Sequence, residues 1–207
     1  MKISAVFSRN RNKNYFDTEF KNLIIIIVTF IIAVISGTII VFTNYSFFEK
    51  TRGSLFLSFF TGYSSKSLYM IILSEICNEA LFLLLCIVFG SSAYGKAPII
   101  ATVFLKIEGL ATIASYILSA YQLKGLEYYL LIYLPGNILI IFTVLFVAVK
   151  CLNRSEIIKK IIIKNNSAEY EKLTYVKQFI FASVVIIISA LTDSILIRVF
   201  SPLFSFS

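Results

Sequence analysis

The sequence predicts an all-α protein, a polytopic bundle of transmembrane helices with five spans. The chain has 207 residues, of which 58% are apolar, and its mean hydropathy is +0.88, a balance that soluble domains rarely reach. It also contains five separate apolar stretches, each at least as long as the roughly 20 residues that a helix needs to cross hydrocarbon. Isolated strands cannot satisfy their backbone in lipid, so these stretches are expected to be helices. The length allows one compact bundle, a single integral membrane domain over 1–207.

The first two predicted spans are long apolar runs. The span at 23–43 follows a basic leader, and its length is about twice that of a signal-peptide core, which favours an uncleaved anchor. A mixed segment at 44–68, rich in Ser, Phe and Tyr, separates it from the span at 69–89. Both runs are long enough to cross a bilayer as helices.

Turn residues and a basic segment set the other three spans apart. Pro98 stands at the start of the third span, where its missing N–H is harmless. A tight turn with Gly125 follows that span, and the basic segment 150–177 precedes the last one. These three spans cover 98–121, 128–149 and 178–200.

Basic residues gather on one side of the predicted bundle. With the N-terminus inside, the segments 1–22, 90–97 and 150–177 hold thirteen of the 19 Lys and Arg residues, and the outer segments hold four. The positive-inside rule supports this orientation. We expect a multi-pass protein of the cell membrane with a cytoplasmic N-terminus and an extracytoplasmic C-terminus.

Composition also bears on the function class. The net charge is +8, but most basic residues flank apolar spans, so membrane topology and lipid headgroups account for them and nucleic acid is not an expected partner. Histidine, the commonest metal ligand, is absent. The three cysteines show no CxxC pattern, so we expect them to act as small apolar residues in helix contacts. No nucleophile with a base, phosphate-binding loop or metal cluster is recognisable. We expect a non-enzyme without cofactor or metal.

Two glutamates near the outer end of the second span share a helix face. Glu75 and Glu79 are one turn apart, a spacing at which paired carboxylates can serve a proton or cation pathway. Their place within the first three turns favours a hydrated position that points outward at the interface.

The other charged residues inside spans have different expected surroundings. Lys106 is near enough to the inner end of its span for its side chain to reach the headgroups. Glu108 is deeper, and we expect it to find a partner on another helix. Asp193 and Arg198 are poorly spaced for a pair within one helix, so each is expected to bond a neighbouring helix or the outer loop.

Two segments have distinctive local patterns. Pro135-Gly136-Asn137 predicts a kink or break in the fourth span, a feature found in transporter binding sites and in plain packing kinks alike. The basic segment 150–177 alternates isoleucines with lysines, a pattern typical of an amphipathic helix on the inner leaflet. Membrane lipid is its expected partner, with an inner-side protein as the alternative.

Several motifs together resemble the stage II sporulation protein M family, small membrane proteins of endospore-forming bacteria. The family pattern has a phenylalanine-leucine-lysine run, then a glycine turn, then a proline-containing motif in the next span. Gly136 stands where the family has a glutamine. The matching positions here are Asn78, Phe104-Leu105-Lys106, the run 118–126 with Gly125, Leu134-Pro135-Gly136-Asn137, and Ser201-Pro202-Leu203.

The resemblance implies a membrane scaffold for engulfment of the forespore. Such a scaffold recruits membrane-anchored cell-wall hydrolases that degrade peptidoglycan, and the catalysis belongs to these partners. The outer loop 44–68 and the kink around Pro135 are then the expected contact regions. The sequence leaves open whether copies of the chain form a homo-oligomer.

The alternative is a membrane transporter or permease subunit. In that case Glu75, Glu79, Glu108 and the break at Pro135 would line a path. Five spans do not divide into an obvious inverted repeat, and a lone subunit would need further copies or an ATPase partner.

Overall fold

A computed structural model describes residues 2–43, 68–164 and 172–200 of the chain. Within these ranges every residue outside the short turn 91–95 is helical, and none forms a strand. This confirms the all-α class. The elements are α1 (Lys2–Thr43), α4 (Leu68–Gly90), α5 (Lys96–Tyr128), the π-helical segment η2 (Tyr129–Tyr133), α6 (Leu134–Lys164) and α7 (Lys172–Phe200).

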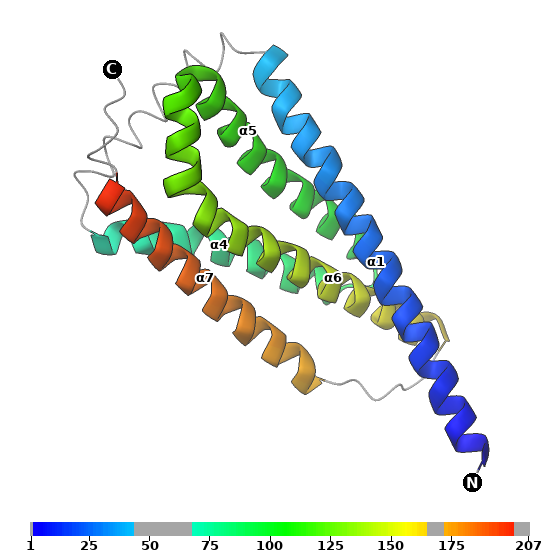
Figure 1. Cartoon of the computed structure of the whole chain (residues 1–207). Coiled ribbons are helices and arrows are strands. Elements are labelled where there is room, and N and C mark those ends of the chain that lie inside the picture. The colour runs from blue at the N-terminus through cyan, green and yellow to red at the C-terminus, as the bar shows by residue number, and fades with distance from the viewer. Residues whose placement is uncertain (1, 44–67, 165–171, 201–207) are drawn as a thin grey trace.

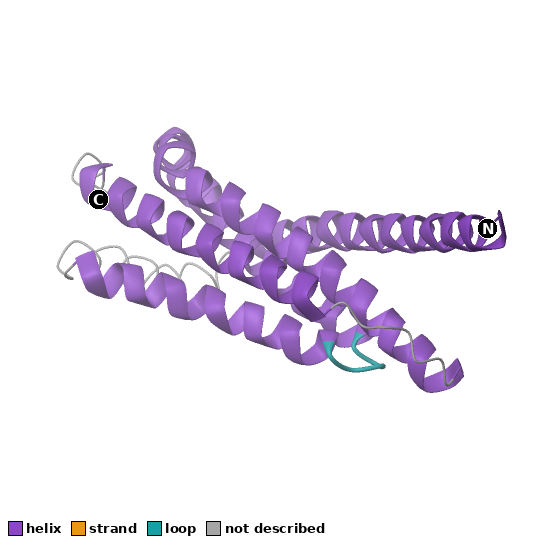
Figure 2. Ribbon diagram, turned by 90° about the horizontal axis from the view of Figure 1, so that it is seen from below, coloured by secondary structure: helices purple, strands orange, loops and turns teal. Residues whose placement is uncertain are grey.

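The helices form one layered bundle (Figure 1). α1 packs mainly along α5, α6 packs along α7, and α4 contacts α5, α6 and α7. The N-terminal part of α1 projects beyond the other helices, as both views show (Figures 1 and 2). The link between α4 and α5 is the teal turn in Figure 2. The apolar core includes Ile26, Val103, Ile107, Val144 and Leu152, which are contributed by α1, α5 and α6.

Two helices extend beyond their predicted spans. α1 begins at Lys2 because neither Gly nor Pro occurs before Gly37 to interrupt it, and its apolar portion is Thr18–Thr43. α6 continues to Lys164, so the first half of the basic segment prolongs the preceding helix. Residues 165–171 lie outside the described ranges.

Four described helical stretches are long and apolar enough to cross a membrane, where the sequence predicts five. The stretch Lys96–Ile162 counts as one because helical bonding continues through α5, η2 and α6 for 67 residues. A straight helix of that length would measure about 100 Å, roughly three times the thickness of hydrocarbon. The stretch is not straight: Gln122 inside it has φ 48° and ψ −123°, and the chain turns back there (Figure 1).

The outside of the bundle is apolar. On α1, Ile31, Ile35 and Ile39 lie one turn apart and are 50–53% exposed. In the most apolar 18-residue window of each candidate span only 28–39% of the residues are buried, so the majority are at least partly exposed. A water-soluble protein rarely presents such a continuous apolar surface. The helices therefore fit a multi-pass membrane protein.

Gly37 lets α1 and α5 approach closely. A Cβ atom added at Gly37 would lie 2.6 Å from the Glu108 carbonyl oxygen and 2.9 Å from the Cβ atom of Ala111. Small residues serve the same purpose at many helix contacts in membranes, where packing rather than water exclusion drives association.

We expect Gly37→Ala to destabilise the protein by about 1–3 kcal/mol, because the added methyl group meets backbone that cannot yield without separating the two helices. The matched control is Gly109→Ala on α5, where an added Cβ has no atom within 4 Å. Thermal unfolding of both variants in detergent measures the difference. Equal stability of the two variants would contradict the close contact.

Candidate functional site

An ion pair between α4 and α5 is the most buried charged contact that the structure describes. Lys106 Nζ donates to Glu79 Oε1, and the two side chains are 15% and 5% exposed. Two predictions are therefore wrong: Lys106 does not extend to the headgroups, and Glu79 does not point outward into water. The reason is the low dielectric of the interior, where a charge is stabilised by a neighbouring opposite charge.

Glu75 and Glu79 do lie on one side of α4, but their surroundings differ. Glu79 is buried against Lys106, whereas Glu75 is half-buried. Asn78, between them in sequence, is exposed on the surface of α4. The structure thus separates Asn78 from the polar groups that face the bundle.

Glu108 bonds a different helix, as predicted. Ser36 Oγ on α1 donates to Glu108 Oε1 at 2.8 Å, directly beside the close contact at Gly37. The sequence showed that Glu108 needed a partner, because a carboxylate at that depth is costly when unpaired. It gave no indication that the partner would be Ser36.

The predicted kink is built from a π-helical turn and a glycine. The five residues Tyr129–Tyr133 are π-helical and end two residues before Pro135, and the chain bends there (Figure 1). Such turns arise where the regular bonding pattern is interrupted, as a proline requires. Asn137 Nδ2 donates to the Tyr133 carbonyl at 2.6 Å and satisfies an acceptor at the break.

Asp193 on α7 packs against this break. A Cβ atom at Gly136 would lie 1.8 Å from Asp193 Oδ1, so a larger residue there would displace the Asp193 carboxylate. Ser189 Oγ, one turn before Asp193 on α7, donates to the Gly136 carbonyl at 2.9 Å. Asp193 Oδ1 is buried and has no hydrogen-bond partner among the described residues. Asp193 also lies within electrostatic range of Glu75 and Glu79.

Gly125 and Arg198 lie apart from these contacts. A Cβ atom at Gly125 would be 2.3 Å from the Ile117 carbonyl oxygen, so the turn at Gln122 requires glycine three residues later. Arg198 is exposed in the last turn of α7, whereas Asp193 is buried against α6. The structure therefore groups Asp193 with α6.

Two buried contacts near the other end of the bundle were not predicted. Asn22 Nδ2 on α1 donates to Asn153 Oδ1 on α6 at 2.7 Å, and both side chains are buried. Cys86 and Cys151 are also buried and in contact across α4 and α6. Each pair joins residues far apart in sequence, and no local pattern reveals which helix faces which.

The described residues also bear on metal binding. No group of three or more Cys, Asp and Glu side chains in these ranges could hold a metal ion. The chain matches no protein-family model, and the comparisons with curated proteins and with solved structures give no match either. The polar contacts themselves are therefore the basis for a functional proposal.

We expect Glu79→Gln and Lys106→Met each to cost about 3 kcal/mol, because each leaves one charge buried without its partner. The double variant should regain part of this loss, since no lone charge remains. Unfolding in mild detergent measures all three.

A surface pair in the same chain provides the control. Lys96 and Glu156 are 3.3 Å apart with side chains 40% and 22% exposed, so Glu156→Gln should cost less than about 1 kcal/mol. Comparable losses for Glu79→Gln and Glu156→Gln would show that burial does not strengthen the first pair.

Proposed function

We propose that the protein is a non-enzymatic membrane scaffold, similar to the stage II sporulation protein M family. It holds membrane-anchored cell-wall hydrolases in place during forespore engulfment. The observation that carries this proposal is that the buried charges of α4 and α5 are engaged in contacts between helices. Charged side chains that bond to neighbouring helices stabilise one arrangement of the bundle, which is what a scaffold requires.

The interhelical bonds connect the bundle step by step. Glu79–Lys106 joins α4 to α5, and Ser36–Glu108 joins α5 to α1. Asn22–Asn153 joins α1 to α6 at the other end. A polar bond inside an apolar medium resists sliding of the helices, because breaking it exposes unpaired groups. A fixed arrangement of this kind suits a platform for other proteins.

The residues that carry the family resemblance support the same proposal. Lys106, Gly125, Pro135 and Asn137 lie at joints of the bundle: the α4–α5 ion pair, the turn after Gln122 and the break before α6. Residues at such joints shape the bundle, and this agrees with a family pattern that is structural and not catalytic.

The exposed apolar faces provide surface for partners inside the membrane. Ile31, Ile35 and Ile39 on α1 are half-exposed and can pack against lipid or the membrane anchor of a hydrolase. The kink around Pro135 remains a proposed contact region. The loop 44–68 is also proposed for partner contact; its last residue, Leu68, begins α4, and residues 44–67 lie outside the described ranges.

The scaffold proposal includes five membrane crossings. α5 and the η2–α6 stretch serve as separate crossings because the chain turns back at Gln122. The start of α1 and the 91–95 turn are then cytoplasmic, and the end of α7 is extracytoplasmic, in agreement with the basic residues. The cell membrane is the proposed location.

Cysteine labelling measures this topology. Tyr94 and Leu123 are 84% and 76% exposed at the two turns that bound the first part of α5. In a background without Cys77, Cys86 and Cys151, Leu123→Cys should react with an impermeant thiol reagent in intact cells. Tyr94→Cys should react only after permeabilisation. Reaction of both positions from one side would rule out the five-crossing arrangement.

Co-purification from sporulating cells tests the scaffold itself. The tagged protein, solubilised in mild detergent, should recover peptidoglycan-degrading activity on a cell-wall gel, and an unrelated polytopic protein with the same tag should not. Recovery of the protein without hydrolase activity in repeated preparations would argue against the proposal.

A transporter or permease subunit is the second candidate, and Asp193 is the observation that favours it. Its buried Oδ1 has no hydrogen-bond partner among the described residues, and it lies at a helix break near Glu75 and Glu79. Carboxylates at broken helices in membranes serve ion and proton pathways in many transporters.

Proteoliposome flux distinguishes the two candidates. If the protein conducts protons, Asp193→Asn should abolish the flux reported by a trapped pH dye, because the amide cannot exchange a proton. Glu156→Gln, at the surface pair, should leave flux unchanged. The scaffold proposal predicts no flux above empty vesicles for the unmodified protein.

A further inference from the structure

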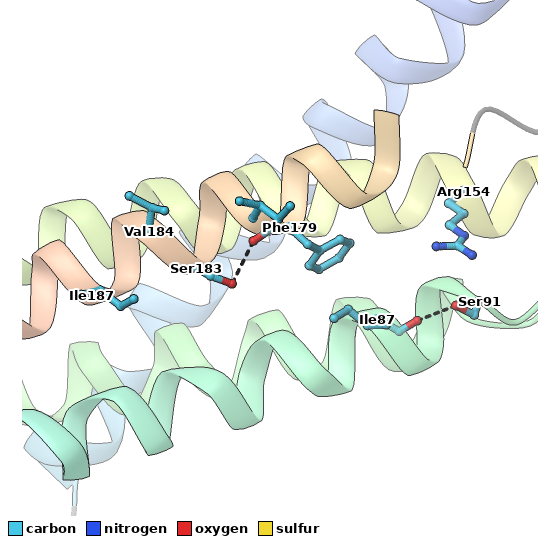
Figure 3. A pocket seen from close by; sticks show the side chains of 8 residues that line it. Ile87, Ser91, Arg154, Phe179, Ser183, Val184 and Ile187 are labelled. Atoms are coloured by element: carbon cyan, nitrogen blue, oxygen red, sulfur yellow. Dashed lines mark hydrogen bonds between the residues drawn. The ribbon is translucent and has the colours of Figure 1, made fainter. Parts of the chain in front are cut away.

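A groove opens on the outside of the bundle between the inner halves of α4 and α7 (Figure 3). Its volume is about 520 Å³, and the end of α6 closes one side with Arg154. The groove is lined by Ile87, Ser91, Arg154, Phe179, Ile180, Ser183, Val184 and Ile187.

The two ends of the groove differ in chemistry. Along α7 and α4 the wall is aliphatic, made by Ile87, Ile180, Val184 and Ile187. At the other end the Arg154 side chain extends from α6 toward the end of α4, where Ser91 lies (Figure 3). A groove with an apolar wall and a guanidinium at one end is complementary to an acyl chain attached to a phosphate.

The charged end of the groove lies at the basic end of the bundle. At this level an ion pair between Lys150 and Glu19 joins α6 to α1, and one between Lys96 and Glu156 joins α5 to α6. The basic residues with described side chains here outnumber these two carboxylates: Lys21, Lys96, Lys150, Arg154, Lys159, Lys160 and Lys177. Such an excess attracts anionic lipid at the membrane surface.

We propose that this groove binds an anionic diacyl phospholipid, with one acyl chain along the aliphatic wall and the phosphate on Arg154. Arginine suits this role because its planar guanidinium can donate two parallel hydrogen bonds to phosphate oxygens. The site is distinct from the proposed hydrolase contacts and does not depend on them.

The size of the groove favours a lipid over a partner helix. Small-molecule sites measure about 300–1,000 Å³, and this groove lies within that range. A helix with its side chains is about 10–12 Å across and would lie over the groove, away from Arg154.

Native mass spectrometry of the purified full chain, titrated with phosphatidylglycerol or with phosphatidylcholine of the same acyl chains, tests the site. Phosphatidylglycerol should bind about tenfold more tightly. Arg154→Gln should weaken its binding about tenfold, the effect of losing one charge-assisted contact. The matched control is Arg198→Gln, which changes an exposed arginine in the last turn of α7, away from the groove, and should leave binding as in the unmodified protein.

A second variant keeps the test decisive if Arg154→Gln does not fold. Ser183→Phe fills the aliphatic part of the groove from an exposed position on α7 and leaves Arg154 in place, so it should also weaken phosphatidylglycerol binding. Unchanged binding in Ser183→Phe, or equal affinity for the two lipids, would overturn the proposal. Equal competition by glycerol 3-phosphate would also overturn it, since the acyl chain would then contribute nothing. Because no hydrolase is present, a negative result leaves the scaffold proposal standing.

Discussion

Hydrocarbon offers no hydrogen-bond partner, and this constraint governs the whole bundle. The helices satisfy their own backbone, and hydroxyl groups such as those of Thr29, Thr102 and Thr143 donate to carbonyls one turn earlier. Charged side chains cannot be satisfied by a carbonyl of their own helix, so they need partners on other helices. Glu79 with Lys106 is the clearest case, because this buried ion pair joins α4 to α5.

The same constraint gives the bundle two different regions. At the α1–α5 and α4–α5 contacts, Glu108 and Glu79 each have a partner on the neighbouring helix, and Gly37 lets the α1 and α5 backbones approach closely. Where α7 crosses the break before α6, Asp193 is buried against Gly136 with one oxygen unpaired. The first region is the basis of the scaffold proposal, and the unpaired Asp193 oxygen in the second is the basis of the transporter alternative.

Sequence reasoning located the helices well and their partners poorly. The second predicted span agrees with α4 to within a residue at each end, and Glu108 was correctly expected to bond another helix. Lys106 was assigned to the headgroups because its depth allowed it, while its actual partner, Glu79, belongs to a different predicted span. The position of a residue within its span indicates its depth in the membrane, but it does not indicate which residue of another helix it contacts.

The sequence by itself determined that the protein is helical and suited to a membrane, because hydropathy and helix length are properties of each local stretch. Only the tertiary structure decided which helix faces meet: the contact of Asn22 with Asn153, the packing of Asp193 on Gly136, and the groove that ends at Arg154. These depend on the rotation and register of helices relative to one another. In a chain so uniformly apolar, many rotations satisfy the hydrophobic pattern equally, and a few polar contacts select one.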